Sequence, residues 1–202
     1  MSHYRHRSNE TLEAIARKII NSYDPSLLHT PSYIPVETIM EKAYGLTLEF
    51  QYIRKNGRIL GETVFEDAQI PIYDRMSGEG YKLIDVKAGT VIIDASLTNQ
   101  RSTGRFRYTC AHELAHWVID KNYFMELGLT AAMTKAVRSS ESDIDVERQA
   151  DRLACRILMP KNMIKRAFHA NRNNNATETL ADLFGVSRQA MKIRLEELGL
   201  LC

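Results

Sequence analysis

Cysteine is scarce in this chain: three occur, at positions 110, 155 and 202. An odd number of widely spaced cysteines builds no disulfide framework and is typical of reduced thiols inside a cell. Long apolar runs are missing as well, since none approaches the roughly 18 residues of a membrane span. The first residues also lack the apolar core of a signal peptide. We therefore expect a cytoplasmic protein without a membrane segment.

Charge of one sign is not in excess either. The 27 lysines and arginines nearly balance the 25 aspartates and glutamates, which leaves a net charge of +2. A surface with this balance has no strong overall attraction to polyanions. We interpret the basic stretch 1–10 as a frayed end rather than an arm that binds nucleic acid. The 202 residues contain no internal repeat and fit one compact domain, with or without a small appendage.

The spacing of apolar residues changes from helical to alternating near residue 46, which indicates an α+β fold. Helices are predicted over 11–23, with Thr11 as N-cap, and over 36–43, ended by Gly45. Alternation predicts a strand over 46–52, and Asn56-Gly57 predicts a hairpin turn into a return strand over 58–65. Further strands are predicted over 70–73, 81–86 and 91–94. Together they would form a small, mostly antiparallel sheet of three to five strands, whose edge strand could pair with an extended peptide.

The second half of the chain has helical spacing. One helix is predicted over 105–121, and another begins within 139–143 and ends at Met159. Pro160 is then the predicted first residue of a third helix. Residues 122–140 could form a short helix or a mobile lid, and 171–175 is a predicted loop. The last segment predicts a helix–turn–helix unit, with its turn at Gly185 and its second helix capped by Ser187.

Two histidines lie four residues apart in the stretch His112-Glu113-Leu114-Ala115-His116. Residues i and i+4 share one face of a helix, so both imidazoles could hold one Zn²⁺ at adjacent tetrahedral corners. Glu113 lies about 100° around the helix, from where its carboxylate could act as a general base on a water. The apolar spacing of the flanking residues marks a buried helix, which disfavours a solvated histidine face.

A catalytic zinc ion usually has three protein ligands, so a third residue is needed. Cys110 faces about 200° away from His112 around the helix, which excludes it. Cys155 is a weak candidate because a buried free cysteine is usually a small hydrophobe. His169 follows on a later helix and is more typical of a surface histidine.

Glu147 and Asp151 are the favoured candidates near the third ligand position. They are spaced i and i+4 on a predicted helix, where like charges repel. The repulsion is resolved if Glu147 binds the metal and Asp151 accepts the free ring N–H of a metal-bound histidine. The alternative is a solvated acidic edge that pairs with Arg148 or Arg152.

Three segments resemble a known family: RFRYTCAHELAHWVID, ERQADRLACRILMP and LADLFGVSRQAMKIRLEELGLL. An HExxH motif followed by ExxxD on a later helix is similar to the gluzincin pattern. Over about residues 105–200 the chain resembles the ImmA/IrrE family of zinc metallopeptidases. The resemblance implies a catalytic Glu113 and three zinc ligands, His112, His116 and Glu147. Alanine stands at 115 where glycine is frequent, and aspartate at 151 where asparagine is frequent, but neither difference removes a ligand or the base.

With the resemblance, the expected organisation has three parts. Residues 1–34 form an N-terminal helix and an irregular segment, and residues 35–175 form a zincin-like metallopeptidase domain with the HExxH helix packed on the sheet. Residues 176–202 form the helix–turn–helix-like segment, packed on the same domain. Its second helix carries four polar residues that could meet DNA, Arg188, Gln189, Lys192 and Arg194. We favour a packed helical pair, because two glutamates at 196 and 197 reduce the positive charge.

The function that the resemblance implies is that of a zinc-dependent endopeptidase. Some members of the family cleave a helix–turn–helix repressor and so relieve repression on mobile elements or under stress. The substrate is therefore expected to be such a repressor, and direct binding of nucleic acid is not expected. An oxyanion-stabilising group is also needed, and the candidates are Tyr73, Tyr108, Tyr123 and His169. The alternatives are a DNA- or repressor-binding regulator with a structural or inactive zinc site, and a zinc hydrolase that acts on a non-peptide bond.

Overall fold

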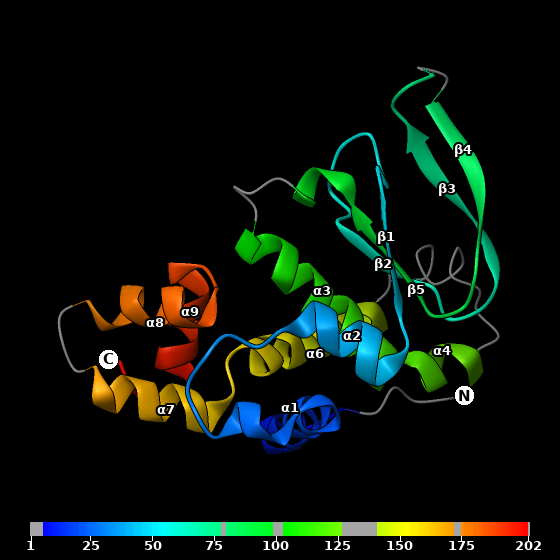
Figure 1. Cartoon of the computed structure of the whole chain (residues 1–202). Coiled ribbons are helices and arrows are strands. Elements are labelled where there is room, and N and C mark those ends of the chain that lie inside the picture. Colours follow the sequence, from blue (N-terminus) through cyan, green and yellow to red (C-terminus); the bar gives the residue numbers. More distant parts are fainter. Residues whose placement is uncertain (1–5, 78–79, 99–102, 127–140, 172–174, 202) are drawn as a thin grey trace.

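The computed structural model describes residues 6–77, 80–98, 103–126, 141–171 and 175–201. Its α+β architecture, which confirms the predicted fold class, places two small sheets over one end of a helical body (Figure 1). The helices are α1 (Asn9–Tyr23), α2 (Val36–Tyr44), α3 (Thr103–Ile119), α4 (Lys121–Glu126), α6 (Glu141–Leu158), α7 (Lys161–Ala170), α8 (Ala176–Phe184) and α9 (Arg188–Glu197). Short 3-10 turns cover Pro25–Leu28 and Ala95–Thr98. Within the described ranges, no helix is long and apolar enough to cross a membrane.

Helix ends follow local capping rules, with two shifts from the predicted positions. Ser8, not Thr11, is the N-cap of α1, because its side chain accepts a hydrogen bond from the backbone N–H of Thr11. Pro160 is the N-cap of α7 rather than its first residue, so the helix begins one residue later than predicted. Gly45 ends α2 in the left-handed conformation, as predicted, with φ of 64°.

The sheet differs from the predicted hairpin arrangement. The strands are β1 (Thr47–Gln51), β2 (Gly61–Thr63), β3 (Ala68–Asp74), β4 (Gly80–Val86) and β5 (Thr90–Asp94). The prediction that 46–52 and 58–65 pair as a hairpin is wrong, because β5 lies between β1 and β2 in the order β1-β5-β2. β5 runs parallel to β1 and antiparallel to β2. β3 and β4 form a separate antiparallel hairpin that projects from the body (Figure 1).

Burial explains why β5 takes the central place. All five of its residues are buried, including the apolar run Val91-Ile92-Ile93. A strand that is apolar on both faces must be covered on both faces, and such a strand belongs in the middle of a sheet. The side chains of β1 are half-buried or exposed, which suits an edge. The Asn56-Gly57 turn does form, but it only redirects the chain before β2.

One hydrophobic core joins all three predicted parts of the chain. It contains Leu12 of α1, Leu114 and Ala115 of α3, and Phe184 and Leu195 of the C-terminal pair. The boundaries at residues 34 and 175 therefore cross a continuous core, and as domain limits they stay a prediction. The predicted lid segment 122–140 begins within α4, and residues 127–140 lie outside the described ranges.

A buried arginine on the HExxH helix anchors the C-terminal helix pair. Arg107 has no exposed surface, and its guanidinium donates to the backbone oxygens of Phe184 (2.8 Å) and Gly185 (2.6 Å) at the end of α8. It also donates to the backbone oxygen of Ile34 and stacks on Tyr33, 3.6 Å from the ring centre. Gly185 has a φ of +62°, and a Cβ atom there would lie 2.7 Å from the guanidinium. Arg107 thus ties the helix that carries the histidines to the segment before α2 and to the C-terminal helix pair.

Arg194 does not belong to the exposed polar face of α9 on which the sequence analysis placed it. Its exposed fraction is 1%, and its guanidinium bonds to Glu13, Glu197 and the backbone oxygen of Met159. Arg156 of α6, also 1% exposed, contacts the same two glutamates. We call the four residues Glu13, Arg156, Arg194 and Glu197 the ion cluster. The cluster joins α1, α6 and α9.

Acid is expected to weaken the ion cluster through Glu197. Burial alone would raise the pKa of Glu197, but Arg194 and Arg156 outweigh it, so the pKa lies below its usual range. Such a carboxyl contributes stability above its unfolded-state pKa of about 4.3, and the contribution is lost as pH falls through the lower folded-state value. We therefore expect Glu197→Gln to be less stable than wild type near neutral pH, with a difference that shrinks at about pH 3. Urea unfolding at both pH values would check this, and a difference independent of pH would contradict it.

Candidate metal centre

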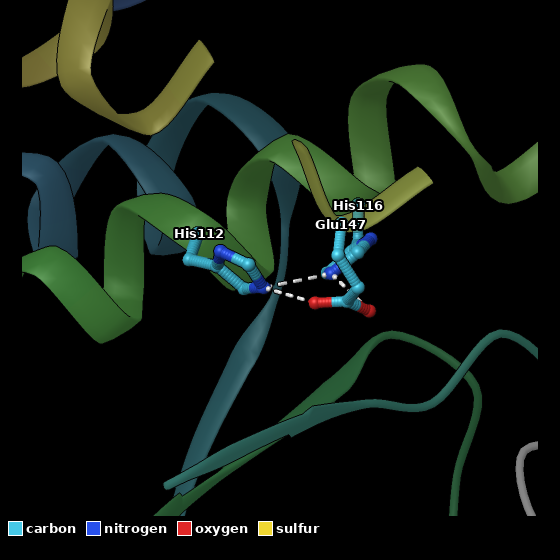
Figure 2. A group of neighbouring side chains, drawn as sticks. All are labelled: His112, His116 and Glu147. Atoms are coloured by element: carbon cyan, nitrogen blue, oxygen red, sulfur yellow. Dashed lines mark hydrogen bonds and ion pairs between the residues drawn. The ribbon is translucent and has the colours of Figure 1, made fainter. Parts of the chain in front are cut away.

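Three side chains from two helices converge on one point (Figure 2). His112 and His116 project from α3, and Glu147 projects from the neighbouring helix α6. The Nε2 atoms of the two histidines are 2.9 Å apart, and Glu147 Oε2 is 3.2 Å from His112 Nε2. Glu147 Oε1 is 3.6 Å from His116 Nε2. One ligand atom from each residue lies within 4.8 Å of the others, so the three side chains can hold a metal ion.

Each histidine is oriented by a carboxylate on the far side of its ring. His112 Nδ1 is 3.0 Å from Asp151 Oδ1, and His116 Nδ1 is 2.8 Å from Asp120 Oδ2. An ionised carboxylate only accepts hydrogen bonds, so each Nδ1 carries the hydrogen. When the rings are neutral, as metal binding requires, their Nε2 lone pairs point at each other and at Glu147. This is the arrangement in which metal-binding histidines are found.

The charges around the two rings favour a positive charge between them. Burial alone would lower the pKa of His112, but Asp151 and Glu147 outweigh it and raise the pKa to about 10. The pKa of His116 is also raised, since Asp120 and Glu147 outweigh complete burial. Two imidazolium rings cannot both direct protons at each other across 2.9 Å. A single cation shared by the three ligands satisfies the same groups.

The remaining ligand candidates lie elsewhere. Cys110 is fully buried in the core, and burial raises the pKa of its thiol. Cys155 packs on the same core, where burial raises its pKa to about 11. His169 is exposed on α7 against Phe168. Within the part of the chain that the structure describes, no other group of three ligating side chains comes together.

Glu113 lies beside the metal ligands without being one of them. Its side chain is 3% exposed, and its Oε2 accepts a 2.7 Å hydrogen bond from the Thr63 hydroxyl on β2. A Cβ atom on Gly61 would lie 2.5 Å from Glu113 Oε1, so a larger residue at this position would displace the carboxylate. β2 therefore fixes one carboxylate oxygen and leaves room for the other.

A cleft of about 710 Å³ opens over these residues. Its lining includes His112, Glu113 and Glu147 on one side and Leu60 and Gly61 of the β2 segment on the other. Of the four candidates for oxyanion stabilisation, Tyr108 is the one that lines the cleft. Its hydroxyl donates to Asp151 Oδ1 at 2.9 Å, and burial together with Asp151 raises its pKa. Tyr108 therefore acts on Asp151, and through it on His112, as a positioning residue.

The other three oxyanion candidates pack against their own neighbours. The Tyr73 ring meets Tyr81 on the β3–β4 hairpin, and the Tyr123 ring meets Phe124 on α4. His169 lies against Phe168, as described above.

Three residues of the site were not predicted from the sequence: Asp120, Thr63 and Gly61. Asp120 had a local signal, because it lies four residues after His116 and therefore on the same helical face. Thr63 and Gly61 had none, since only the packing of β2 on α3 brings them to Glu113.

Replacing Asp120 with asparagine is expected to weaken zinc binding by about 10–100-fold. The asparagine amide can donate to Nδ1 of His116 and so favour the tautomer whose Nε2 carries hydrogen and cannot bind metal. Competition with a chromophoric chelator would measure the affinity. Asp145→Asn is the matched control, because Asp145 is exposed on α6 and its ion pair is with Arg148 rather than with a metal ligand. Equal zinc affinity in Asp120→Asn and wild type would show that Asp120 does not orient His116.

Comparison with known proteins agrees with this geometry. A family model described as the IrrE N-terminal-like domain, Peptidase_M78, matches residues 96–196. That is half of the chain, and it includes α3, α6 and both C-terminal helices. The match is to a metallopeptidase family. The chain belongs to the Peptidase_M78 family, which confirms the predicted ImmA/IrrE relationship.

Among solved structures, a Mycobacterium tuberculosis transcriptional regulator is similar in fold, with a TM-score of 0.51 and 15% identity. The similarity covers 93% of this chain and 46% of the regulator, so the chain spans about half the length of that protein. At this identity the likeness extends to the fold alone. No match was found among curated proteins.

Proposed function

We propose that this chain is a cytoplasmic zinc-dependent endopeptidase that cleaves a helix–turn–helix transcriptional repressor and so relieves repression. The observation that carries the proposal is the convergence of two Nε2 atoms and one carboxylate beside a buried glutamate that is not a ligand. Two imidazoles and a carboxylate are a donor set that suits Zn²⁺ and leaves a coordination position open. When bound, zinc would supply Lewis acidity, which polarises a scissile carbonyl and makes a nearby water more acidic.

Glu113 supplies the proton transfers in this proposal. Thr63 holds Oε2, so Oε1, on the side of Gly61 and the cleft, takes the proton from the attacking water. The same oxygen then gives the proton to the leaving amine. Burial beside the two histidines keeps the carboxylate close to the reacting bond, and Asp151 and Asp120 keep both rings in the metal-binding tautomer.

The edge of β2 supports an extended peptide substrate. Asp94 N–H donates to the Leu60 oxygen (2.8 Å), and Val64 N–H donates to the Thr90 oxygen (2.9 Å). Alternate residues of an antiparallel strand face the same neighbour, so the backbone groups of Gly61 and Thr63 face the opposite edge. A peptide that pairs with Gly61 there would lie across the cleft beside Glu113.

The family relationship supports a regulatory substrate, because cleavage of a repressor changes transcription, and the structurally similar M. tuberculosis protein is a transcriptional regulator. The direct test starts from the genes that flank this one and takes a helix–turn–helix protein encoded there as the candidate substrate. Purified, zinc-loaded enzyme is incubated with that protein, and the fragments are identified by mass spectrometry. Cleavage at a defined bond that stops with a chelator and returns with zinc is expected. An intact repressor after prolonged incubation with the zinc-loaded enzyme would contradict the choice of substrate.

A DNA-binding regulator is the second candidate, and the charges on α9 weigh against it. Arg194 is buried, Arg188 pairs with Glu178, and Lys192 lies 3.8 Å from Glu196. Cations that are already paired with carboxylates must give up those contacts to bind phosphate, which weakens the attraction of α9 for DNA. A gel-shift assay at low salt that showed tight binding of DNA would favour this second candidate.

A further inference from the structure

Two more hollows continue from the cleft along α9. Their volumes are about 340 and 470 Å³, and both are lined by Tyr108, Met159, Ala190 and Ile193. Because they share these four residues, we treat them as one feature and call it the α9 groove. It lies between the first turns of α3, the second half of α6 and the outer face of α9.

The α9 groove is continuous with the cleft at the metal centre. Tyr108 lines the cleft and both hollows, and Asp151 lines the cleft and the larger hollow. These two residues are hydrogen-bonded to each other and hold His112. A peptide that leaves the metal centre past Tyr108 therefore enters the groove directly.

The chemistry of the groove selects an apolar occupant. Met159 is buried, Ala190 is half-buried, and Ile193 exposes 55% of its surface although it lines a hollow. The polar groups nearby are already used, since the Tyr108 hydroxyl bonds to Asp151 and Arg156 bonds to Glu197. A bound apolar group that covers Ile193 removes apolar surface from water, which favours binding.

The rim of the groove is cationic. Arg105 and Arg152 line its two hollows, are exposed, and form no ion pair within the described residues. Both can reach a carboxylate on a bound chain. Nucleic acid fits less well, because the floor between these two arginines is apolar and the other arginine of the lining, Arg156, is already paired with Glu197.

We propose that the α9 groove is a substrate subsite that takes a large aliphatic or aromatic side chain of the protein being cleaved, next to an acidic residue at the rim. The proposal rests on the proposed peptidase function and adds what that peptidase selects. The side chain in the groove lies away from the scissile bond, so Ile193 and Ala190 determine specificity without taking part in the chemistry.

The test is a cleavage profile of the full-length, zinc-loaded protein on a synthetic library of randomised dodecapeptides, with the products sequenced by mass spectrometry. At one fixed position beyond the cut we expect large apolar residues to be cleaved at least about tenfold faster than small polar ones. At a neighbouring position we expect aspartate and glutamate to be enriched, and Arg152→Gln to reduce that enrichment.

Two variants alter the groove in different ways. Ile193→Asn makes the wall polar and should reduce the apolar preference by about 3–10-fold. Ala190→Phe fills the groove and should shift the preference from large side chains to small ones. Leu183→Asn is the matched control, because Leu183 is a similarly exposed aliphatic residue (38%) on α8 and lines neither the cleft nor the groove. Zinc content and melting temperature of each variant show that folding is retained.

The outcomes separate this inference from the proposed function. Cleavage of the library without a side-chain preference, or with a preference that both groove variants leave unchanged, would overturn the subsite and leave the peptidase intact. A zinc-loaded protein that cuts neither the library nor the repressor would overturn both. A wild-type dimer that Ile193→Asn converts to a monomer with an unchanged cleavage profile would identify the groove as a contact between two copies and overturn the subsite.

Discussion

Replacing Glu113 with glutamine is expected to lower kcat by about 10²–10⁴-fold while zinc remains bound. Glutamine keeps the shape of the side chain and can still meet the Thr63 hydroxyl, but it cannot take a proton from water. The metal ligands do not include Glu113, so zinc affinity should be close to that of wild type. Peptide cleavage and zinc content measured on the same preparation would check both halves of this expectation.

The matched comparison is His116→Ala. His116 is fully buried and places its Nε2 atom at the metal position, so its removal should abolish tight zinc binding as well as cleavage. Loss of activity with zinc retained in Glu113→Gln, and loss of both in His116→Ala, would separate the base from the ligands. Cleavage by Glu113→Gln at the wild-type rate would refute the role given to Glu113.

Replacing Arg194 with methionine is expected to lower the free energy of unfolding by about 3–5 kcal/mol. Methionine fills part of the volume but removes the cation shared by Glu13 and Glu197, and it leaves the Met159 carbonyl without its donor. Arg156 alone then faces both carboxylates. For a chain of this size the change corresponds to a melting temperature lower by roughly 10 °C.

Lys192→Met is the control for this experiment. Lys192 is exposed on the same helix, and its pair with Glu196 at 3.8 Å is a surface ion pair. Such pairs contribute about 0–1 kcal/mol, so Lys192→Met should unfold at nearly the wild-type urea concentration. If Arg194→Met and Lys192→Met were equally stable, the ion cluster would not hold α9 in place.

Features that depend on a few neighbouring residues were predictable. The two histidines of the HExxH stretch had to share a helical face, because the helix repeats every 3.6 residues. The repulsion between Glu147 and Asp151 at i and i+4 pointed in the same way to a shared positive partner. In the structure, Glu147 meets the histidines and Asp151 meets His112. Helix ends were predictable to within a few residues for the same local reason.

Partners far apart in the sequence were not predictable. Alternation identified the strand at 46–52, but it carries no information about which strand lies beside it, and β5 rather than β2 took that place. The polarity of Arg194 indicated the surface, because a lone cation is costly to bury. Two glutamates, one of them from the first helix, removed that cost.

The sequence by itself determined the family, the helices and the residues that meet at the metal position, because each of these depends on local spacing. The tertiary structure decided how those residues are supported. It brought Thr63 and Gly61 to Glu113 and opened the α9 groove beside Tyr108. It also let Arg107 bond to the end of α8 and let the ion cluster join α1, α6 and α9. These contacts join segments that are up to 181 residues apart, or form where three helices meet, and no short-range pattern encodes them as a set.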